Sequence, residues 1–149
     1  MSYRIGKNFW LSEKRLCELA MECEEYLQVR LEKYSAKLEA TYTELKEIHE
    51  DWFSEMTENE FYEKFVKLAE DGKIDLLDSI MLNEDIDELS DALDDVYFST
   101  KHIKRLEYKI EITSRTFSNA LCGIKVDASD MEPTLKLAKN RGTLYKKAS

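Results

Sequence analysis

An uninterrupted apolar stripe constrains this chain more than any other feature of its sequence. Apolar or small side chains recur every three or four residues from Leu16 to Trp52, and ten steps cover 36 residues, or 3.6 residues per step. This is the period of a straight amphipathic α-helix. Neither glycine nor proline occurs between Gly6 and Gly72, so nothing in the sequence interrupts the pattern. We therefore predict one long helix over residues 12–54.

A second stripe begins near Asn83 and ends at Leu121, and Gly123 follows it in the position of a helix-ending glycine. It predicts a second long helix over residues 84–122. Two stripes of similar length bury each other when the helices pack as an antiparallel, coiled-coil-like hairpin. The predicted fold class is therefore all-α. Two helices leave part of each stripe uncovered, and pairing of two copies into a four-helix dimer is one way to cover the remainder.

The rest of the chain is predicted to form the two ends of this hairpin within one domain, residues 1–149. Thr57-Glu58-Asn59-Glu60 is a capping-box pattern, and it predicts short helices over residues 57–82 at the tip, the first of them ending at Gly72. Residues 123–149 are predicted to be a basic, partly irregular tail. Four glycines and one proline in 149 residues are too few for the turns of a β-sandwich or barrel.

The apolar residues nowhere form a run of about eighteen, and the N-terminus lacks the apolar stretch of a signal peptide. We expect a cytoplasmic protein without a membrane partner. The three cysteines form neither a zinc-binding pattern nor an even disulfide framework.

Charge is distributed very unevenly along the chain. Residues 39–95 contain twenty acidic and four basic side chains, a local balance of −16, whereas the remaining residues sum to +7. Solubility requires net charge but not its concentration in one window. The alternative is that the acidic residues form only a solvated helix face.

The densest acidic run is the strongest candidate for a partner-binding site. Carboxylates spaced along helices present negative charge at a density similar to that of a nucleic-acid backbone. Interleaved aromatic residues could anchor such a surface on a basic partner. We refer to the nine carboxylates of this run as the acidic tip, and they are Asp75, Asp78, Glu84, Asp85, Asp87, Glu88, Asp91, Asp94 and Asp95. The aromatic residues expected to contribute are Trp52, Phe53 and Phe61, with Tyr62, Phe65, Tyr97 and Phe98 nearby in the sequence.

This pattern is expected of a non-enzymatic interaction module that docks on a larger protein with a basic, nucleic-acid-binding surface. An immunity protein or a phage anti-defence protein would act in this way, as a nucleic-acid mimic. We predict no catalytic residue, no metal and no cofactor.

The first alternative is an enzyme. Glu88-Leu89-Ser90-Asp91 resembles the Glu-x-x-Asp element of the all-α nucleoside triphosphate pyrophosphatases, and the resemblance covers some seven residues. It implies a Mg²⁺ site completed by Glu44 and Glu47 or by Glu22 and Glu25.

The second alternative uses the basic end as a scaffold or as a nucleic-acid-binding surface. The basic side chains of the tail could contact phosphates or an acidic protein. They are Lys136, Lys139, Arg141, Lys146 and Lys147. Aromatic residues are sparse there, so nucleic acid is not the favoured partner.

Overall fold

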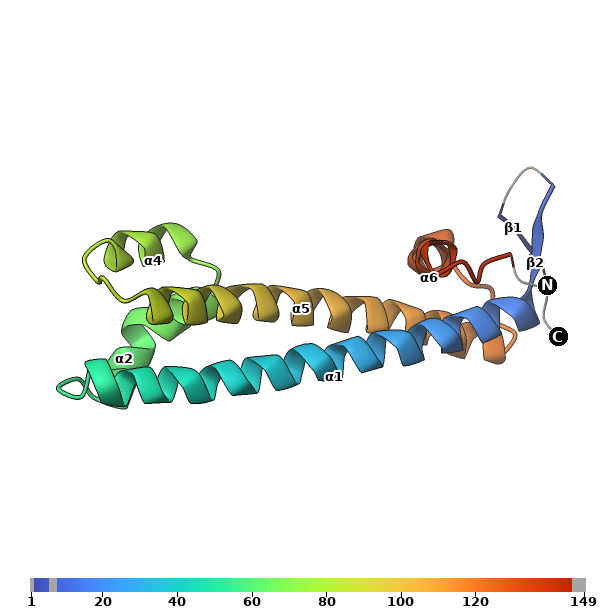
Figure 1. Ribbon diagram of the computed structural model, residues 1–149. Coiled ribbons are helices and arrows are strands. Elements are labelled where there is room, and N and C mark those ends of the chain that lie inside the picture. The colour runs from blue at the N-terminus through green and yellow to red at the C-terminus, as the bar shows by residue number, and fades with distance from the viewer. Residues whose placement is uncertain (1, 6–7, 146–149) are drawn as a thin grey trace. The chain divides into compact units, whose positions relative to one another are not determined.

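The computed structural model describes residues 2–5 and 8–145, and its described elements confirm the all-α helical hairpin (Figure 1). Two long helices, α1 and α5, run antiparallel to each other. The only sheet among the described residues is a two-stranded one in which Tyr3 pairs with Leu11. In chain order the elements are β1 (Ser2–Arg4), β2 (Trp10–Ser12), α1 (Glu13–Trp52), α2 (Glu58–Phe61), the π-helical turn η1 (Tyr62–Val66), α3 (Lys67–Glu70), α4 (Ile74–Met81), α5 (Asp87–Leu121) and α6 (Ala128–Asn140).

The chain forms two compact units. Unit 1 comprises residues 1–31 and 105–149, and unit 2 comprises residues 32–104. Each unit has its own hydrophobic core, and α1 and α5 contribute to both.

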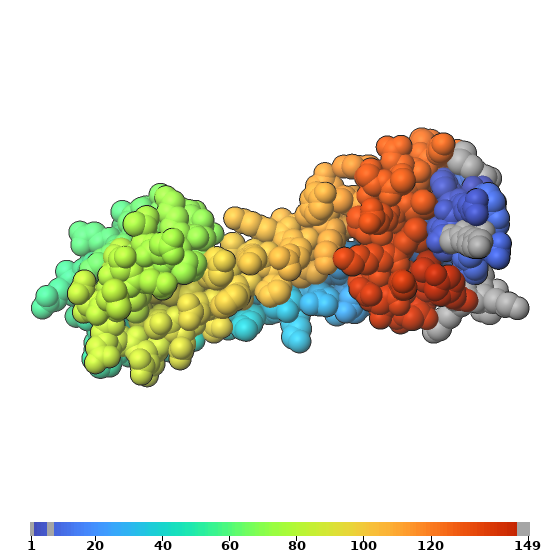
Figure 2. Space-filling model, turned by 90° about the horizontal axis from the view of Figure 1, so that it is seen from above, coloured from blue at the N-terminus to red at the C-terminus, as the bar shows by residue number. Residues whose placement is uncertain are grey.

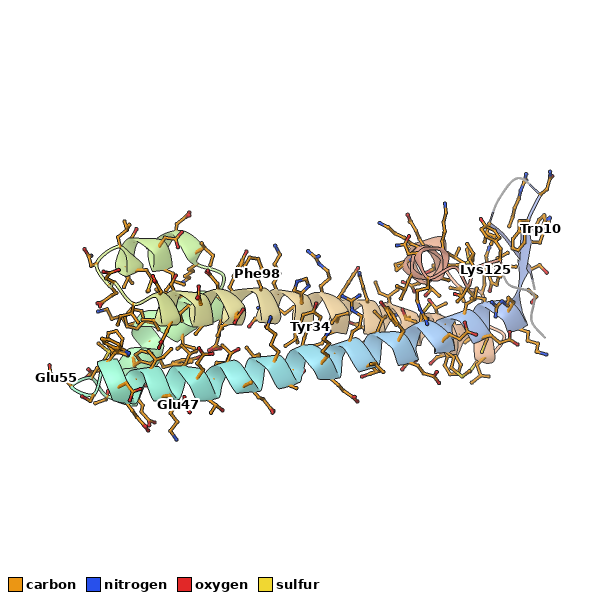
Figure 3. All side chains as sticks on the ribbon, in the orientation of Figure 1. Trp10, Tyr34, Glu47, Glu55, Phe98 and Lys125 are labelled. Atoms are coloured by element: carbon orange, nitrogen blue, oxygen red, sulfur yellow. The ribbon has the colours of Figure 1, made fainter. Side chains whose placement is uncertain are left out.

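The core of unit 2 forms where the short helices cover the ends of α1 and α5. The rings of Phe53, Phe61 and Phe65 lie 5.4–5.5 Å apart, and His49 lies 5.1 Å from Phe61. The buried residues are Leu45, Ile48, Phe61, Phe65, Val66, Ala69, Leu77, Leu89, Ala92, Leu93 and Val96. Further along the same two helices, Tyr34 of α1 lies between α1 and α5 and stacks on His102 (Figure 3).

The core of unit 1 forms between the other ends of α1 and α5, the sheet and α6. Tyr3 is buried, and its hydroxyl oxygen accepts a hydrogen bond of 3.1 Å from the backbone N–H of Val126. Arg15 donates to the carbonyl of Thr143 over 2.8 Å. These contacts tie the N-terminal strand and the C-terminal segment to the same core, which contains Tyr3, Leu11, Leu16, Leu19, Cys23, Ala120, Val126, Ala138 and Leu144.

The helix ends follow the capping signals of the sequence. The Thr57 hydroxyl accepts a hydrogen bond from the backbone N–H of Glu60 over 3.1 Å, as the capping-box pattern predicts. Gly72 and Gly123 have φ of +73° and +71°, and the residue after each donates back to the carbonyl five residues earlier, over 2.9 Å and 2.8 Å. Both glycines therefore end helices in the left-handed conformation that other residues rarely adopt.

Helix α6 is the element that the sequence analysis did not identify, because residues 123–149 were interpreted as an irregular basic tail. Pro133 lies inside this helix, and the residues that face the core include Thr134, which is fully buried. An internal proline and a polar core residue both obscured the helical period.

None of the helices in the described part of the chain combines the length and the apolar character that a membrane-spanning segment needs.

Substitution of a core leucine should separate packing from surface effects. Leu89→Ala should lower the free energy of unfolding by about 2–5 kcal/mol, because the Leu89 side chain is fully buried in unit 2 and its removal leaves a cavity. Leu82→Ala is the matched control and should change it by less than about 0.5 kcal/mol, because Leu82 is 87% exposed. Urea unfolding followed by circular dichroism measures both, and equal losses would contradict this core.

Candidate interaction surfaces

The uneven charge of the sequence divides between the two units. Unit 2 contains 21 acidic and 8 basic side chains, a net charge of −13, and unit 1 contains 10 acidic and 14 basic side chains, a net charge of +4. The excess of negative charge therefore belongs to one compact unit with its own core.

The acidic tip lies on two neighbouring helices of unit 2 and the segment that joins them. Asp75 and Asp78 are on α4, Glu84 and Asp85 precede α5, and the other five are on the first turns of α5. Figure 2 shows α4 and the beginning of α5 side by side on one face of this unit. Seven of the nine carboxylates are on exposed residues, and Glu84 and Asp95 are half-buried.

Few of these carboxylates have a cationic partner. Glu84 pairs with Lys64 over 3.6 Å, and Asp95 pairs with Lys37 over 3.8 Å. Within residues 2–5 and 8–145, the other seven make no ion pair. Their negative charge is therefore neutralised only by solvent ions, which a basic partner would displace.

Crowding of like charges is visible at Asp94. The pKa of its carboxyl group is raised, first by partial loss of hydration and then by the negative charges of Asp78, Asp91 and Asp95. Asp78 is on α4, whereas Asp91, Asp94 and Asp95 are on α5. The two helices therefore bring together carboxylates that are distant in the sequence.

The aromatic residues near the acidic tip divide into core and surface. Phe61 is only 4% exposed and Phe53 is half-buried, and both rings belong to the aromatic core of unit 2. Phe61 is therefore a core residue and not an exposed anchor beside the acidic tip, because its side chain is already enclosed by other rings. Trp52 is 62% exposed and remains available.

Three exposed apolar residues lie on the same two helices as the carboxylates or directly after them. Phe98 of α5 is 54% exposed and points away from α1 (Figure 3), and Leu76 and Leu82 are 56% and 87% exposed. The sequence analysis did not select Leu76 or Leu82, because helical spacing alone does not show which side of a short helix faces the core. They add exposed apolar area to the elements that carry the acidic tip.

The carboxylate pairs of the enzyme alternative do not form a metal site. Glu44, Glu47, Glu88 and Asp91 are all on exposed residues, and Glu22 and Glu25 belong to unit 1. Among the residues that the structure describes, no group of three or more histidine, cysteine, aspartate or glutamate side chains is arranged to hold a metal ion.

A small cavity of about 190 Å³ opens on another side of unit 2, between α1 and the α2–η1 segment, and we call it the Tyr42 pocket. Tyr62 donates a hydrogen bond to Glu70 over 3.2 Å, and the pKa of Tyr42 is raised to about 12, mainly by burial and then by the charge of Glu70. Both phenols therefore stay neutral at physiological pH. The pocket is lined by Tyr42, Leu45, Lys46, His49, Glu58, Phe61, Tyr62 and Val66.

His49 is a structural part of this pocket wall. Its side chain is only 8% exposed, and its Nε2 lies 2.6 Å from the carbonyl oxygen of Met56. Because a carbonyl only accepts, Nε2 carries the proton in this contact. The ring thereby fixes the loop that follows α1.

The residues predicted at the basic end have different environments. Lys136 and Lys139 are exposed on α6 and line a groove of about 420 Å³ that also includes Tyr145. Arg141 instead lies over the ring of Tyr26 at 4.4 Å and donates to the Glu22 carbonyl over 3.4 Å, so it is engaged inside unit 1. Lys146 and Lys147 lie outside the described residues.

Comparison with known proteins identifies no relative, since no family model, no curated protein and no solved structure matches this chain.

The crowding at Asp94 has a measurable consequence for stability. A raised carboxyl pKa in the folded state means that ionisation of Asp94 opposes folding, so Asp94→Asn should increase the free energy of unfolding at neutral pH. The gain should be on the order of a few tenths of a kcal/mol, because Asp94 is exposed. It should shrink as the pH falls through the raised pKa of Asp94, because the wild-type carboxyl group then takes up its proton and no longer opposes folding. Asp85→Asn, outside this cluster, is the control. Urea unfolding at neutral and at acidic pH compares the stability of the two variants with that of the wild type.

Proposed function

We propose that this protein is a non-enzymatic interaction module whose acidic tip docks on a basic, nucleic-acid-binding surface of a larger protein and blocks it. The observation that carries the proposal is the set of seven exposed carboxylates on α4, α5 and the segment between them that have no ion-pair partner in the described part of the chain. A surface of this kind gains free energy when it meets fixed positive charges.

The mechanism is competition for a basic surface. The field of a unit with a net charge of −13 would speed the approach to a cationic surface and would make the association sensitive to salt. Phe98, Leu76 and Trp52 then supply exposed apolar area, and burial of such area slows dissociation. Inhibition follows because nucleic acid and the acidic tip would occupy the same groove of the partner.

Rigidity supports this role as well. The acidic tip belongs to a unit with a packed aromatic core, and seven of its nine carboxylates are held on the folded helices α4 and α5 before a partner arrives. A preorganised surface loses less conformational entropy on binding than a disordered acidic segment does.

Neutralising part of the acidic tip tests this proposal without destabilising the fold. The variant Asp78→Asn, Glu88→Gln, Asp91→Asn and Asp94→Asn should weaken binding of a fluorescent lysine-rich peptide about tenfold, if each exposed charge contributes about 0.35 kcal/mol. The salt dependence of binding should become weaker too. Fluorescence anisotropy at several salt concentrations measures both quantities.

A matched control removes the same charge from another helix. Glu39→Gln, Glu44→Gln, Glu47→Gln and Glu50→Gln change four exposed residues of α1 and should lower the peptide affinity less than threefold. Circular dichroism should show unchanged helicity for both variants. Equal losses in the two variants would refute a localised site and would leave general negative charge as the explanation.

The groove beside α6 favours a second function, contact with nucleic acid through unit 1. Lys136 and Lys139 are exposed there without an ion pair in the described residues, Tyr145 is 59% exposed, and its ring packs edge-on against Phe9 at 4.9 Å. Exposed rings beside cationic side chains are typical of single-strand binding. A gel shift with a short single-stranded oligonucleotide at low salt should then show a complex that Lys136→Ala with Lys139→Ala weakens, and the absence of any complex would exclude this function.

A further inference from the structure

We propose that the Tyr42 pocket receives an arginine side chain of the basic partner. This inference rests on the proposed function for the identity of the partner, but the chemistry of the pocket can be tested without it. The pocket lies wholly within unit 2, between α1 and the α2–η1 segment.

The size of the pocket suits one planar group. An apolar cavity of about 150 Å³ accommodates a single benzene ring. The Tyr42 pocket has about 190 Å³, which leaves room for a planar guanidinium group and the methylene groups next to it. The pocket owes this shape to the π-helical turn η1, whose first residue, Tyr62, forms part of the wall.

The lining suits a cation with an apolar stem. Leu45 and Val66 provide apolar contacts, and Tyr42 and Tyr62 provide aromatic rings, whose faces attract cations. Glu58 supplies a carboxylate that makes no ion pair with another described residue, which is the partner that a guanidinium group prefers. The hydrogen bond from Tyr62 to Glu70 holds one of these rings in place.

The electrostatic field of unit 2 selects against anionic ligands. With a net charge of −13, this unit attracts cations and repels anions such as phosphates and carboxylates. Arginine is favoured over lysine because guanidinium is more weakly hydrated and stacks on aromatic rings. The chain contains one such arrangement already, since Arg141 lies 4.4 Å from the centroid of Tyr26 in unit 1 and donates to a backbone carbonyl.

Lys46 is the one lining residue that opposes a cationic ligand. It is exposed on α1, and it makes no ion pair with the described residues. Its ammonium group therefore provides a directional test: removal of this charge should strengthen the binding of a cation and weaken the binding of an anion.

The probe is N-acetylarginine amide, and its matched control is N-acetylcitrulline amide, which has nearly the same shape without the charge. In two-dimensional NMR titrations at physiological ionic strength, the arginine probe should shift the signals of Tyr42, Tyr62 and Val66 in a saturable way. The citrulline probe should bind about tenfold more weakly. Equal binding of the two probes, or shifts that map elsewhere, would overturn the proposal.

Variants assign the contributions of single side chains. Lys46→Met should tighten binding of the arginine probe about twofold to threefold, and Glu58→Gln should weaken it by a similar factor. Tyr62→Leu should weaken it about threefold through loss of the ring, whereas Tyr62→Phe should retain most of the affinity. Weaker binding by Lys46→Met would contradict a cation in the pocket.

The neutralised variant of the acidic tip separates this proposal from the proposed function. Its four substitutions lie outside the pocket lining, so it should bind the arginine probe within about threefold of the wild type at physiological ionic strength. If the probe fails to bind the wild type while the lysine-rich peptide still depends on the acidic tip, the pocket proposal is wrong and the docking proposal stands. If instead the arginine probe binds the wild type and binding of the lysine-rich peptide does not depend on the acidic tip, the docking proposal is wrong and the Tyr42 pocket remains a site for organic cations.

Discussion

Mutual burial of two apolar stripes is the interaction on which the rest of this structure depends. α1 has 40 residues and α5 has 35, and most of the stability of amphipathic helices in proteins comes from packing of their apolar face. In both units a stretch of α1 covers a stretch of α5, and the added elements complete each core. Because the stripes use every third or fourth residue, most of the residues between them face solvent, and in unit 2 the charged residues among these are predominantly acidic.

That constraint explains how a unit with a net charge of −13 folds at all. Like charges on neighbouring helices oppose compaction, and they add to the partial loss of hydration in raising the pKa of Asp94. The free energy that offsets this repulsion comes from apolar burial in the core of unit 2. Its almost completely buried residues include Phe65, Leu89, Leu93 and Val96. The packed core therefore tolerates surface charges that oppose folding, and removal of some of them should not destabilise the protein.

The sequence predicts those features that depend on local periodicity and local chemistry. The long helices begin and end within three residues of their predicted bounds, Thr57 caps α2, and Gly72 and Gly123 end helices as expected. Helix α6 could not be predicted in the same way, because its buried face uses Thr134 and Ala138 in place of large apolar residues. The segments before and after α6 are held by Tyr3 and Arg15, which contact Val126 and Thr143 and are far away in the sequence.

The candidate site likewise has features that local sequence predicts and features that it does not. The exposure of the carboxylates follows from helical spacing and was predictable, whereas the burial of Phe61 and the exposure of Phe98 depend on how the short helices pack on α1 and α5. The Tyr42 pocket was not predictable, since it needs the π-helical turn η1 and a wall assembled from α1 and α2.

The two proposed contacts of unit 2 require different chemistry from one partner. The acidic tip acts through charge that is distributed over many side chains, so it favours any strongly basic surface and gives little discrimination among such surfaces. The Tyr42 pocket would receive a single side chain of the partner, and its shape can discriminate between arginine and lysine. A distributed field cannot make this distinction. A partner that matches both would be approached rapidly because of the field and selected because of the pocket. In an inhibitor of a nucleic-acid-binding protein this combination would have a physical purpose: phosphate backbones compete with the acidic tip for the basic groove, but they offer no aromatic pocket to an arginine side chain of the partner.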